Sequence, residues 1–375
     1  MLNYQDYEND FNKLNITKEE GTDYATLLVK GKLWKNFNYP PSYSASGIYC
    51  FKSVFYVSTT SSSYYLKWTE DFSNWSNVTG FSSSLQTFLD CGDFLVLQNS
   101  SYKLFVSNDG KTATELTLLE GMSGFNSLSY ADGKLWIWNN GANKMYSCAD
   151  KTTILEEEGW TGGHTVKEAG NVWLTVISNK LYYSEDKGTT WVECLSLGGN
   201  SSYLDVYTLN NVMLMQVSVG SGSSSHLGVY RSTDGKTWTV VSSSIIGGGN
   251  ALCIAFNKFW AFSTETFTGN PTGLFSSTDG ETWTQVAEFV GLWNNRQCII
   301  GNDNCMLLQS SQKQYYTEDG ETFFSRNFSA TNTSYKATMN EDTLVLGTKD
   351  YSKNFKNTIV RDNTKDLDFA LTPGA

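Results

Sequence analysis

One short phrase recurs along this chain and restricts its fold more than any other feature. The phrase runs Ser or Thr, Asp, Gly, Thr and an aromatic residue, and its clear copies are residues 184–191, 232–238, 277–283 and 317–323. Weaker copies occupy 69–75, 107–113, 149–152 and 361–364. Asp-Gly between two apolar runs is a tight-hairpin signal, and Ser, Thr and Asp side chains can bond the backbone of such a turn. Each copy therefore predicts a hairpin.

The residues of this phrase are expected to be structural. The aspartate can bond the turn, and the aromatic residue that opens the next strand can pack across it. The clearest positions of this kind are Asp109, Asp186, Trp191, Asp234, Trp238, Asp279, Trp283, Asp319 and Phe323.

The spacing of the phrases gives the size of a repeating unit. Successive aspartates are separated by as few as 36 residues (Asp150 to Asp186) and as many as 48 (Asp186 to Asp234). A second series of polar turns lies about halfway between them, and each unit therefore contains four short strands. In the fifth unit we expect these strands at 203–209, 212–218, 228–232 and 237–241.

Four-stranded antiparallel units repeated at this spacing are typical of β-propellers. We predict an all-β chain with a single propeller of about eight four-stranded blades. Seven blades remain an alternative if the first or last unit packs outside the ring. The propeller is assigned to residues 43–375 and a short N-terminal extension to 1–42. Residues 25–37 of the extension read as one or two strands that either wrap the propeller or dock to another body.

The phrase resembles the Asp-box, or bacterial neuraminidase repeat, of the sialidase-like propellers. Residues 184–191 match Ser/Thr-x-Asp-x-Gly-x-Thr-Trp/Phe throughout, whereas the copies at 232, 277 and 317 have one residue fewer between Asp and Gly. The resemblance implies that the box lies on the outer hairpin, on the face away from the ligand site. It does not extend to sialidase chemistry, which needs three arginines around the substrate carboxylate. The four arginines of this chain are Arg231, Arg296, Arg326 and Arg361, and three of them fall beside the phrases.

Composition excludes several other classes. Lys and Arg number 27 against 38 Asp and Glu, which gives a net charge of −11, so the attraction for phosphate that drives nucleic-acid binding is missing. The first residues do not resemble a signal peptide, and no window approaches the ~18 apolar residues of a membrane span. Seven cysteines are an odd number at wide spacing, and we expect buried free thiols.

A candidate ligand surface is formed by the loops that enter strand one of each unit and join strands two and three, because these loops meet on one face of a propeller. Two tryptophans stand outside the repeated phrase in glycine-rich loops, flanked by residues that suit sugar hydroxyls. The alternative is that both indoles fill the central opening of the ring or a contact between subunits. The ligand-binding candidates are Trp160, His164, Tyr203, Trp293, Asn294 and Arg296.

A catalytic site is less well supported. Glycoside hydrolysis usually needs two carboxylates across the scissile bond, and Asp205 with Glu158 or Glu265 is the pair to test. The 2 histidines are too few for a zinc site. We expect no metal and no cofactor.

These features favour a non-enzymatic structural or adhesion protein of a virion, of the kind found in phage tails, with surface glycan or a neighbouring tail protein as its partner. Such a protein is made in the host cytoplasm without a signal peptide, and residues 1–42 would contact other virion proteins, with a homo-oligomer possible. The alternatives are a glycoside hydrolase, sialidase-like or polysaccharide-cleaving, and a cellular protein-interaction scaffold. The composition, rich in Ser, Asn and aromatic residues, is similar to that of phage tail and receptor-binding proteins.

Overall fold

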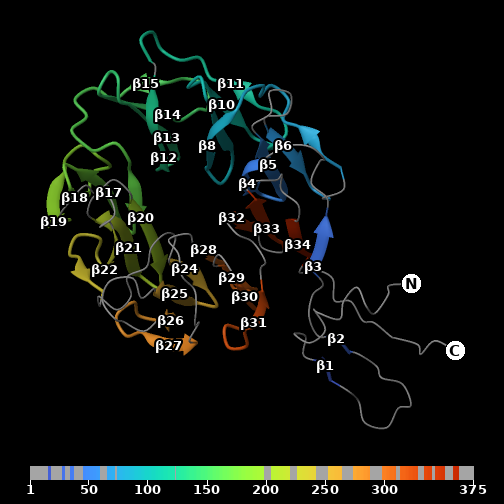
Figure 1. Ribbon diagram of the computed structural model, residues 1–375. Helices are drawn as coiled ribbons and strands as arrows, with labels where there is room; N and C mark the ends of the chain where they lie inside the picture. Colours follow the sequence, from blue (N-terminus) through green and yellow to red (C-terminus); the bar gives the residue numbers. More distant parts are fainter. Residues whose placement is uncertain are drawn as a thin grey trace.

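The computed structural model contains eight four-stranded antiparallel sheets set around a common centre (Figure 1). Every regular element in the described part of the chain is a β-strand, and within that part no helix has the length and hydrophobicity to cross a membrane. The structure describes residues 16–17, 28–29, 34–37, 45–59, 66–71, 74–122, 124–197, 204–219, 226–241, 252–263, 273–287, 298–309, 313–327, 333–339, 343–350 and 358–362.

Each sheet is one blade, and consecutive strands of the chain are neighbours within it. The first blade contains β4 (Ala45–Phe51), β5 (Val54–Thr59), β6 (Leu66–Thr69) and β7 (Ser76–Asn77). The second contains β8 (Leu85–Asp90), β9 (Leu95–Asn99), β10 (Leu104–Ser107) and β11 (Thr114–Glu115). The third contains β12 (Phe125–Ala131), β13 (Lys134–Asn139), β14 (Lys144–Cys148) and β15 (Leu155–Glu156). The fourth contains β16 (Lys167–Ala169), β17 (Val172–Ile177), β18 (Lys180–Ser184) and β19 (Val192–Ser196).

The second half of the ring repeats this arrangement. The fifth blade contains β20 (Leu204–Leu209), β21 (Val212–Val219), β22 (His226–Ser232) and β23 (Thr239–Val240). The sixth contains β24 (Leu252–Ala255), β25 (Lys258–Ser263), β26 (Gly273–Ser277) and β27 (Thr284–Ala287). The seventh contains β28 (Cys298–Gly301), β29 (Met306–Gln309), β30 (Lys313–Thr317) and β31 (Phe324–Asn327). The eighth contains β32 (Thr333–Met339), β33 (Thr343–Asp350), β34 (Thr358–Asp362) and β3 (Trp34–Phe37).

The first strand of each blade lies nearest the centre. Strands β12, β16, β20, β24, β28, β32 and β4 follow one another as inner neighbours from blade to blade (Figure 1). The predicted propeller is therefore confirmed, with eight blades. The strands expected in the fifth unit agree with β20 to β23 to within two residues at each end.

The eighth blade is completed from the other end of the chain. Its outer strand is β3, which pairs antiparallel with β34, Trp34 lying opposite Arg361 and Phe37 opposite Thr358. Residues 34–37 were assigned above to the extension, but their strand belongs to the ring. Its partner lies more than 300 residues away in the sequence, so no local pattern marks the pairing. The small hairpin of β1 (Ile16–Thr17) and β2 (Leu28–Val29) lies outside the ring on the side of this blade (Figure 1).

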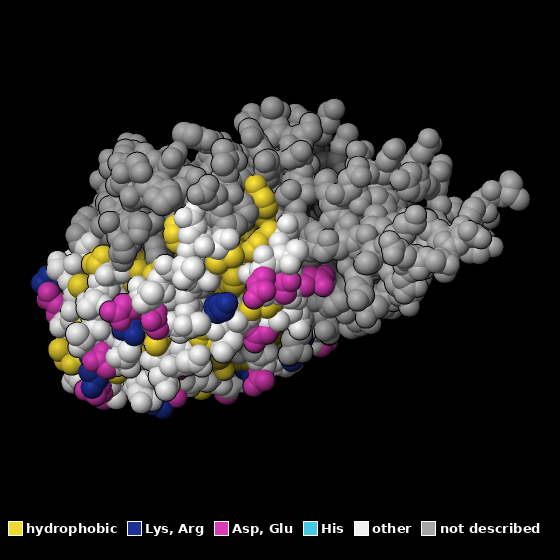
Figure 2. Space-filling model, turned by 90° about the horizontal axis from the view of Figure 1, so that it is seen from below, with side chains coloured by type: hydrophobic (Ala, Val, Ile, Leu, Met, Phe, Trp, Pro, Cys, Tyr) yellow, Lys and Arg dark blue, Asp and Glu magenta, His cyan; other side chains and the backbone are white. Residues whose placement is uncertain are grey.

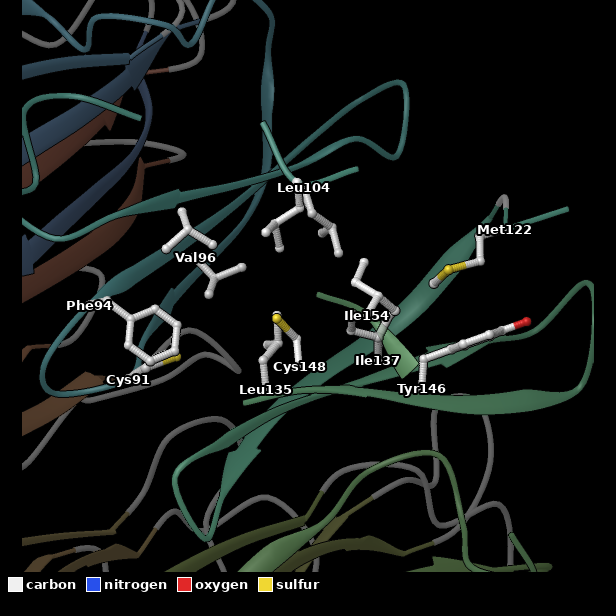
Figure 3. Packing of buried hydrophobic residues seen from close by; sticks show 12 residues of the cluster. Cys91, Phe94, Val96, Leu104, Met122, Leu135, Ile137, Tyr146, Cys148 and Ile154 are labelled. Atoms are coloured by element: carbon white, nitrogen blue, oxygen red, sulfur yellow. The ribbon is translucent and has the colours of Figure 1, made fainter. Parts of the chain in front are cut away.

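The hydrophobic cores lie between blades. Figure 3 shows the cluster in which Phe94 and Leu104 of the second blade meet Leu135, Ile137 and Tyr146 of the third. Equivalent clusters join the first and second blades, and each successive pair from the third to the seventh. Since both faces of a blade are covered by neighbours, these strands carry apolar residues on both sides, which explains runs such as the fully buried β9.

The aspartates of the repeated phrase bond the turn between the third and fourth strands of their blades. We call these the aspartate turns, and they surround Asp71, Asp109, Asp150, Asp186, Asp234, Asp279 and Asp319. In a typical case Asp234 Oδ1 accepts from the backbone N–H groups of Lys236 and Thr237 at 2.8 and 2.7 Å. Ser232 Oγ donates to the same carboxylate at 2.9 Å and accepts from Gly235 N–H at 2.8 Å.

Five of the aspartate turns contain a glycine, and the glycines of the second, fifth, sixth and seventh blades lie against the preceding blade. A Cβ on Gly235 would lie 2.4 Å from Val172 Cγ2, and one on Gly280 would lie 2.9 Å from Leu214 Cδ2. Both glycines have positive φ, +72° and +68°, a conformation that other residues adopt only with strain. Glycine is therefore required at this position for two reasons. The turn needs a positive φ, and the preceding blade lies too close to leave room for a Cβ.

Lysines of the aspartate turns add polar links between blades. In the second to fifth blades the turn lysine reaches back to the blade before it. These contacts are Lys111 to Glu70, Lys151 to Asn108, Lys187 to Asp132 and Lys236 to Glu185. In the sixth and seventh blades the residues at the lysine position are Glu281 and Glu321. Between the fifth and sixth blades the donor belongs to the preceding blade, since Arg231 Nε of the fifth blade donates to the carbonyl of Asp279 in the sixth at 2.7 Å.

A second set of ion pairs lies on the outer edges of three blades. Each joins a lysine of the third strand to a glutamate of the fourth at 2.6 or 2.7 Å: Lys103 to Glu115, Lys144 to Glu156 and Lys180 to Glu193. Figure 2 views the rim from below, and basic and acidic side chains lie beside one another at several places on its described surface. Charges along an outer strand oppose pairing with strands of other molecules.

The cysteines that the structure describes are free thiols: Cys50, Cys91, Cys148, Cys194, Cys253 and Cys305. Four are buried, as expected, whereas Cys50 and Cys194 are half-buried. Burial raises the pKa of Cys50, Cys91 and Cys194 to about 12. These thiols are therefore protonated at neutral pH and inert as nucleophiles.

A matched pair of glycine substitutions tests the contact between blades. Gly235 and Gly133 share a φ of +72°, but a Cβ on Gly133 would have no atom within 4 Å. We expect Gly133→Ala to lower the free energy of unfolding by about 1 kcal/mol through backbone strain alone. Gly235→Ala should lower it by about 2–4 kcal/mol, because overpacking against Val172 is added. Urea denaturation of both variants measures this, and equal losses would contradict the contact.

The aspartate turns also predict weakening in acid. Backbone N–H groups hold the pKa of Asp234 and Asp279 at about 2, below the usual value of about 3.9. A carboxyl whose pKa is lower in the folded state stabilises the fold fully above pH of about 5 and loses this contribution as the pH falls towards 2. The urea concentration at the midpoint of unfolding should therefore decrease as the pH is lowered from 5 to 2, and this decrease should be smaller in Asp234→Asn. An unchanged slope in that variant would count against the assignment.

Candidate functional site

Polar side chains gather on the inner strands of the third, fourth and fifth blades. We call them the inner polar row: Ser127, Thr165, Lys167, Asp205 and Tyr207. Ser127 lies on β12, Thr165 two residues before β16, Lys167 at the start of β16, and Asp205 and Tyr207 on β20. Inner strands of neighbouring blades run side by side around the centre, so residues about one repeat apart in the sequence become neighbours.

Direct contacts connect this row across the blades. Ser127 Oγ and Thr165 Oγ1 are 2.8 Å apart, which joins the third blade to the fourth. Lys167 Nζ lies 3.5 Å from Asp205 Oδ1, which joins the fourth to the fifth. The hydroxyl of Tyr207 donates to Asp205 Oδ2 at 3.4 Å. The row therefore consists of two hydrogen-bonded groups, Ser127 with Thr165, and Asp205 with Lys167 and Tyr207.

The Lys167–Asp205 pair connects the inner strands of two neighbouring blades, because Lys167 lies on β16 of the fourth blade and Asp205 on β20 of the fifth. Tyr207 packs with residues of the fifth and sixth blades, and Asp205 shares its face of the strand because side chains alternate. The Lys167 and Asp205 side chains are 39% and 32% exposed, which leaves both accessible to a ligand in water.

An aromatic stack adjoins the row. His164 is exposed and lies over Trp138, with ring centroids 4.4 Å apart and an angle of 16° between the planes. Trp138 is paired in register with Ser127, so the stack and the Ser127–Thr165 contact occupy the same end of the third blade. The Nε1 of Trp138 is buried and has no hydrogen-bond partner among the described residues.

Trp160, expected as a ligand-binding or packing residue, is half-buried between the third and fourth blades. Its ring lies 5.3 Å from that of Trp136 and 5.6 Å from that of Trp191. Its indole N–H donates to the carbonyl of Gly163 at 3.3 Å. In this position Trp160 fills the space beside Gly188, the glycine of the fourth aspartate turn. The structure therefore brings Trp160 into the packing between blades.

The fourth aspartate turn has one residue more between its aspartate and glycine than the turns of the fifth and sixth blades. Its tryptophan differs from theirs in hydrogen bonding. Trp238 and Trp283 donate their indole N–H groups to the carbonyls of Gly235 and Gly280 at 3.0 and 3.2 Å. The corresponding Trp191 Nε1 is buried without a partner in the described part of the chain. The extra residue accompanies the insertion of Trp160 at this interface.

Asp205 and Glu158, one of the two carboxylate pairs proposed for catalysis, lie on different blades. Asp205 is on the innermost strand of the fifth blade, whereas Glu158 is exposed and follows β15, the outermost strand of the third. The remaining sequence-based candidates, Tyr203, Glu265, Trp293, Asn294 and Arg296, lie outside the described residues. In the part that is described, no three His, Cys, Asp or Glu side chains gather where they could hold a metal ion.

Sequence reasoning found Asp205 and His164 but missed their neighbours. Lys167 could have been recognised from the sequence as a candidate partner of Asp205, because a charged residue on an inner strand needs an opposite charge or water. Ser127, Thr165 and Trp138 carried none, since Ser, Thr and Trp are common throughout the chain. Their importance follows only from the register of β12 with β13 and from the contact between blades.

No protein-family model matches this sequence, and no curated protein matches it. Solved structures are similar in fold. The computationally designed protein Ika8 aligns with a TM-score of 0.54 at 12% identity, covering 85% of this chain and 96% of its own. YCF48 bound to D1 peptide gives 0.48 at 13% identity, covering 94% and 100%. BamB from Moraxella catarrhalis gives 0.48 at 9% identity, covering 84% and 96%. At these identities the similarity concerns the fold alone.

Substitution of Trp160 distinguishes packing from ligand binding. Trp160→Ala removes a half-buried indole, and we expect the free energy of unfolding to fall by about 2–4 kcal/mol. Trp160→Phe, which keeps part of the volume, should lose less. Free indole should raise the thermal midpoint of the alanine variant but not that of wild type, because it can enter the cavity left behind. An alanine variant as stable as wild type would contradict the packing role.

Proposed function

We propose that this chain is a non-enzymatic binding and assembly protein, a structural or adhesion component of a virion such as a phage tail. In this proposal the inner polar row and the Trp138–His164 stack recognise carbohydrate on a host surface, and the N-terminal segment attaches the disc to a neighbouring protein of the particle. Sugar rings suit such a site, since their C–H faces pack on aromatic rings and their hydroxyls exchange hydrogen bonds with polar side chains.

The observation that carries the proposal is the pairing of Asp205 with Lys167. Glycosidases usually hold two carboxyl groups on either side of the scissile bond, about 5–9.5 Å apart. Here the carboxylate at the centre faces an ammonium group, and Glu158 lies on the outer edge of another blade. This arrangement supports binding more than hydrolysis.

The way the ring closes supports an assembly role. Strand β3 joins residues that precede it to the eighth blade, and the β1–β2 hairpin lies outside the ring beside that blade (Figure 1). A segment held at one point on the rim of a rigid disc is well placed to contact a second protein without covering the inner polar row.

Membership of the Asp-box propellers is part of the proposal. The aspartate turns follow the pattern of that repeat in sequence, and their carboxylates bond the turn as a structural box requires. Their Asp, Gly and Trp residues are engaged with the backbone and with the preceding blade. This supports a structural role for the boxes and leaves the ligand to the inner strands.

Two measurements test the proposed function. Quantitative mass spectrometry of purified virions should find the chain at a fixed copy number per particle. Purified protein should attach to host cells and release no reducing ends from their polysaccharide. Release of reducing ends that is abolished in Asp205→Asn would instead support the glycoside hydrolase alternative. Absence from virions together with no cell attachment would leave the interaction scaffold.

A further inference from the structure

The Lys167–Asp205 contact is the longest ion pair in the described part of the chain. Its N–O distance is 3.5 Å, whereas the other pairs in this part are 2.7 Å or shorter. The Tyr207–Asp205 bond is also long, at 3.4 Å. Charge-assisted hydrogen bonds are normally about 2.7–2.9 Å. A ligand oxygen that reaches both groups at that distance makes better bonds than the two groups make with each other.

The Lys167 ammonium and the Asp205 carboxylate need opposite hydrogen-bonding groups on a ligand. An ammonium only donates hydrogen bonds and an ionised carboxylate only accepts them. A pair of adjacent sugar hydroxyls satisfies both at once, because one oxygen accepts from Lys167 while the other donates to Asp205. A ligand carboxylate would be attracted by Lys167 but repelled by Asp205. A protonated amine would be attracted by Asp205 but repelled by Lys167. The pair carries no net charge, so it favours an uncharged ligand.

The rest of the row extends the same chemistry. The hydroxyls of Ser127 and Thr165 lie next along the inner strands, and Thr165 is only two residues from Lys167. The exposed His164 ring, which is stacked on Trp138, forms a flat aromatic surface near the Ser127 and Thr165 hydroxyls. A ligand that contacts the fourth and fifth blades through a diol therefore has further hydroxyl partners along the row, on the third and fourth blades.

We propose that the inner polar row binds the vicinal diol of a neutral sugar, with Lys167 and Asp205 as its two principal partners. The inference rests on the proposed function and names its ligand class. Acidic sugars such as sialic or uronic acids are the poorer ligands, in contrast to what the sialidase resemblance would suggest.

A glycan array tests this with full-length protein and glycans that end in mannose, glucose, galactose, sialic acid or glucuronic acid. Wild type should bind one or more neutral ends and bind the acidic ends less. Lys167→Met and Asp205→Asn should each weaken the strongest neutral interaction at least tenfold, since each removes a charged hydrogen-bond partner. Lys180→Met and Glu193→Gln are the matched controls, because they break an ion pair on the outer strands of the fourth blade, and both should bind as wild type does.

The thermal midpoint of each variant shows that the fold is intact. No binding to neutral ends by wild type, a preference for acidic ends, or full binding by Lys167→Met and Asp205→Asn would each overturn the inference. Cell attachment separates this failure from failure of the proposed function. If wild type and both variants attach equally to host cells, the adhesion role stands and the inner polar row is not its site. If wild type neither attaches nor occurs in virions, the proposed function fails as well.

Discussion

The contact between an aspartate turn and the blade before it, made by the turns of the second to seventh blades, is the constraint on which the rest of this structure depends. A carboxylate that bonds two backbone N–H groups holds the chain in a turn where glycine has positive φ, and that glycine presents its bare Cα to the neighbouring blade. The tryptophan that follows bonds back to the glycine carbonyl. One local motif therefore shapes the hairpin and sets how closely two blades approach, and its glycine recurs in five of the eight blades.

Closure of the ring converts this repetition into a rigid frame. Strand β3 supplies the outer strand of the eighth blade, and the inner strands β32 and β4 then become neighbours. A blade with both faces covered has little freedom to move, because its apolar residues interdigitate on each side. The inner strands consequently hold polar side chains at set positions, so that Ser127 meets Thr165 and Lys167 meets Asp205 although the partners belong to different blades.

The architecture could be predicted because its determinants are local. Asp234, Gly235 and Trp238 form their turn within a few residues, so the repeated phrase indicated both hairpins and unit length. The site could be predicted only in fragments. Asp205 was recognisable as a charge on an inner strand, but its partner Lys167 lies on another blade. Trp160 in a glycine-rich loop fits a ligand site and a packed interface equally well, and the decisive contacts, with Trp136 and Trp191, are between blades.

The sequence by itself determined the hairpins, the size of the repeating unit and the structural role of the aspartates, because backbone hydrogen bonding and glycine conformation act over a few residues. Only the tertiary structure decided which strand closes the ring, where Trp160 packs and which groups meet Asp205. These contacts join residues one repeat or nearly the whole chain apart, and similar blades offer many equivalent partners. The choice among them follows from the geometry of the closed ring, which no single stretch of sequence contains.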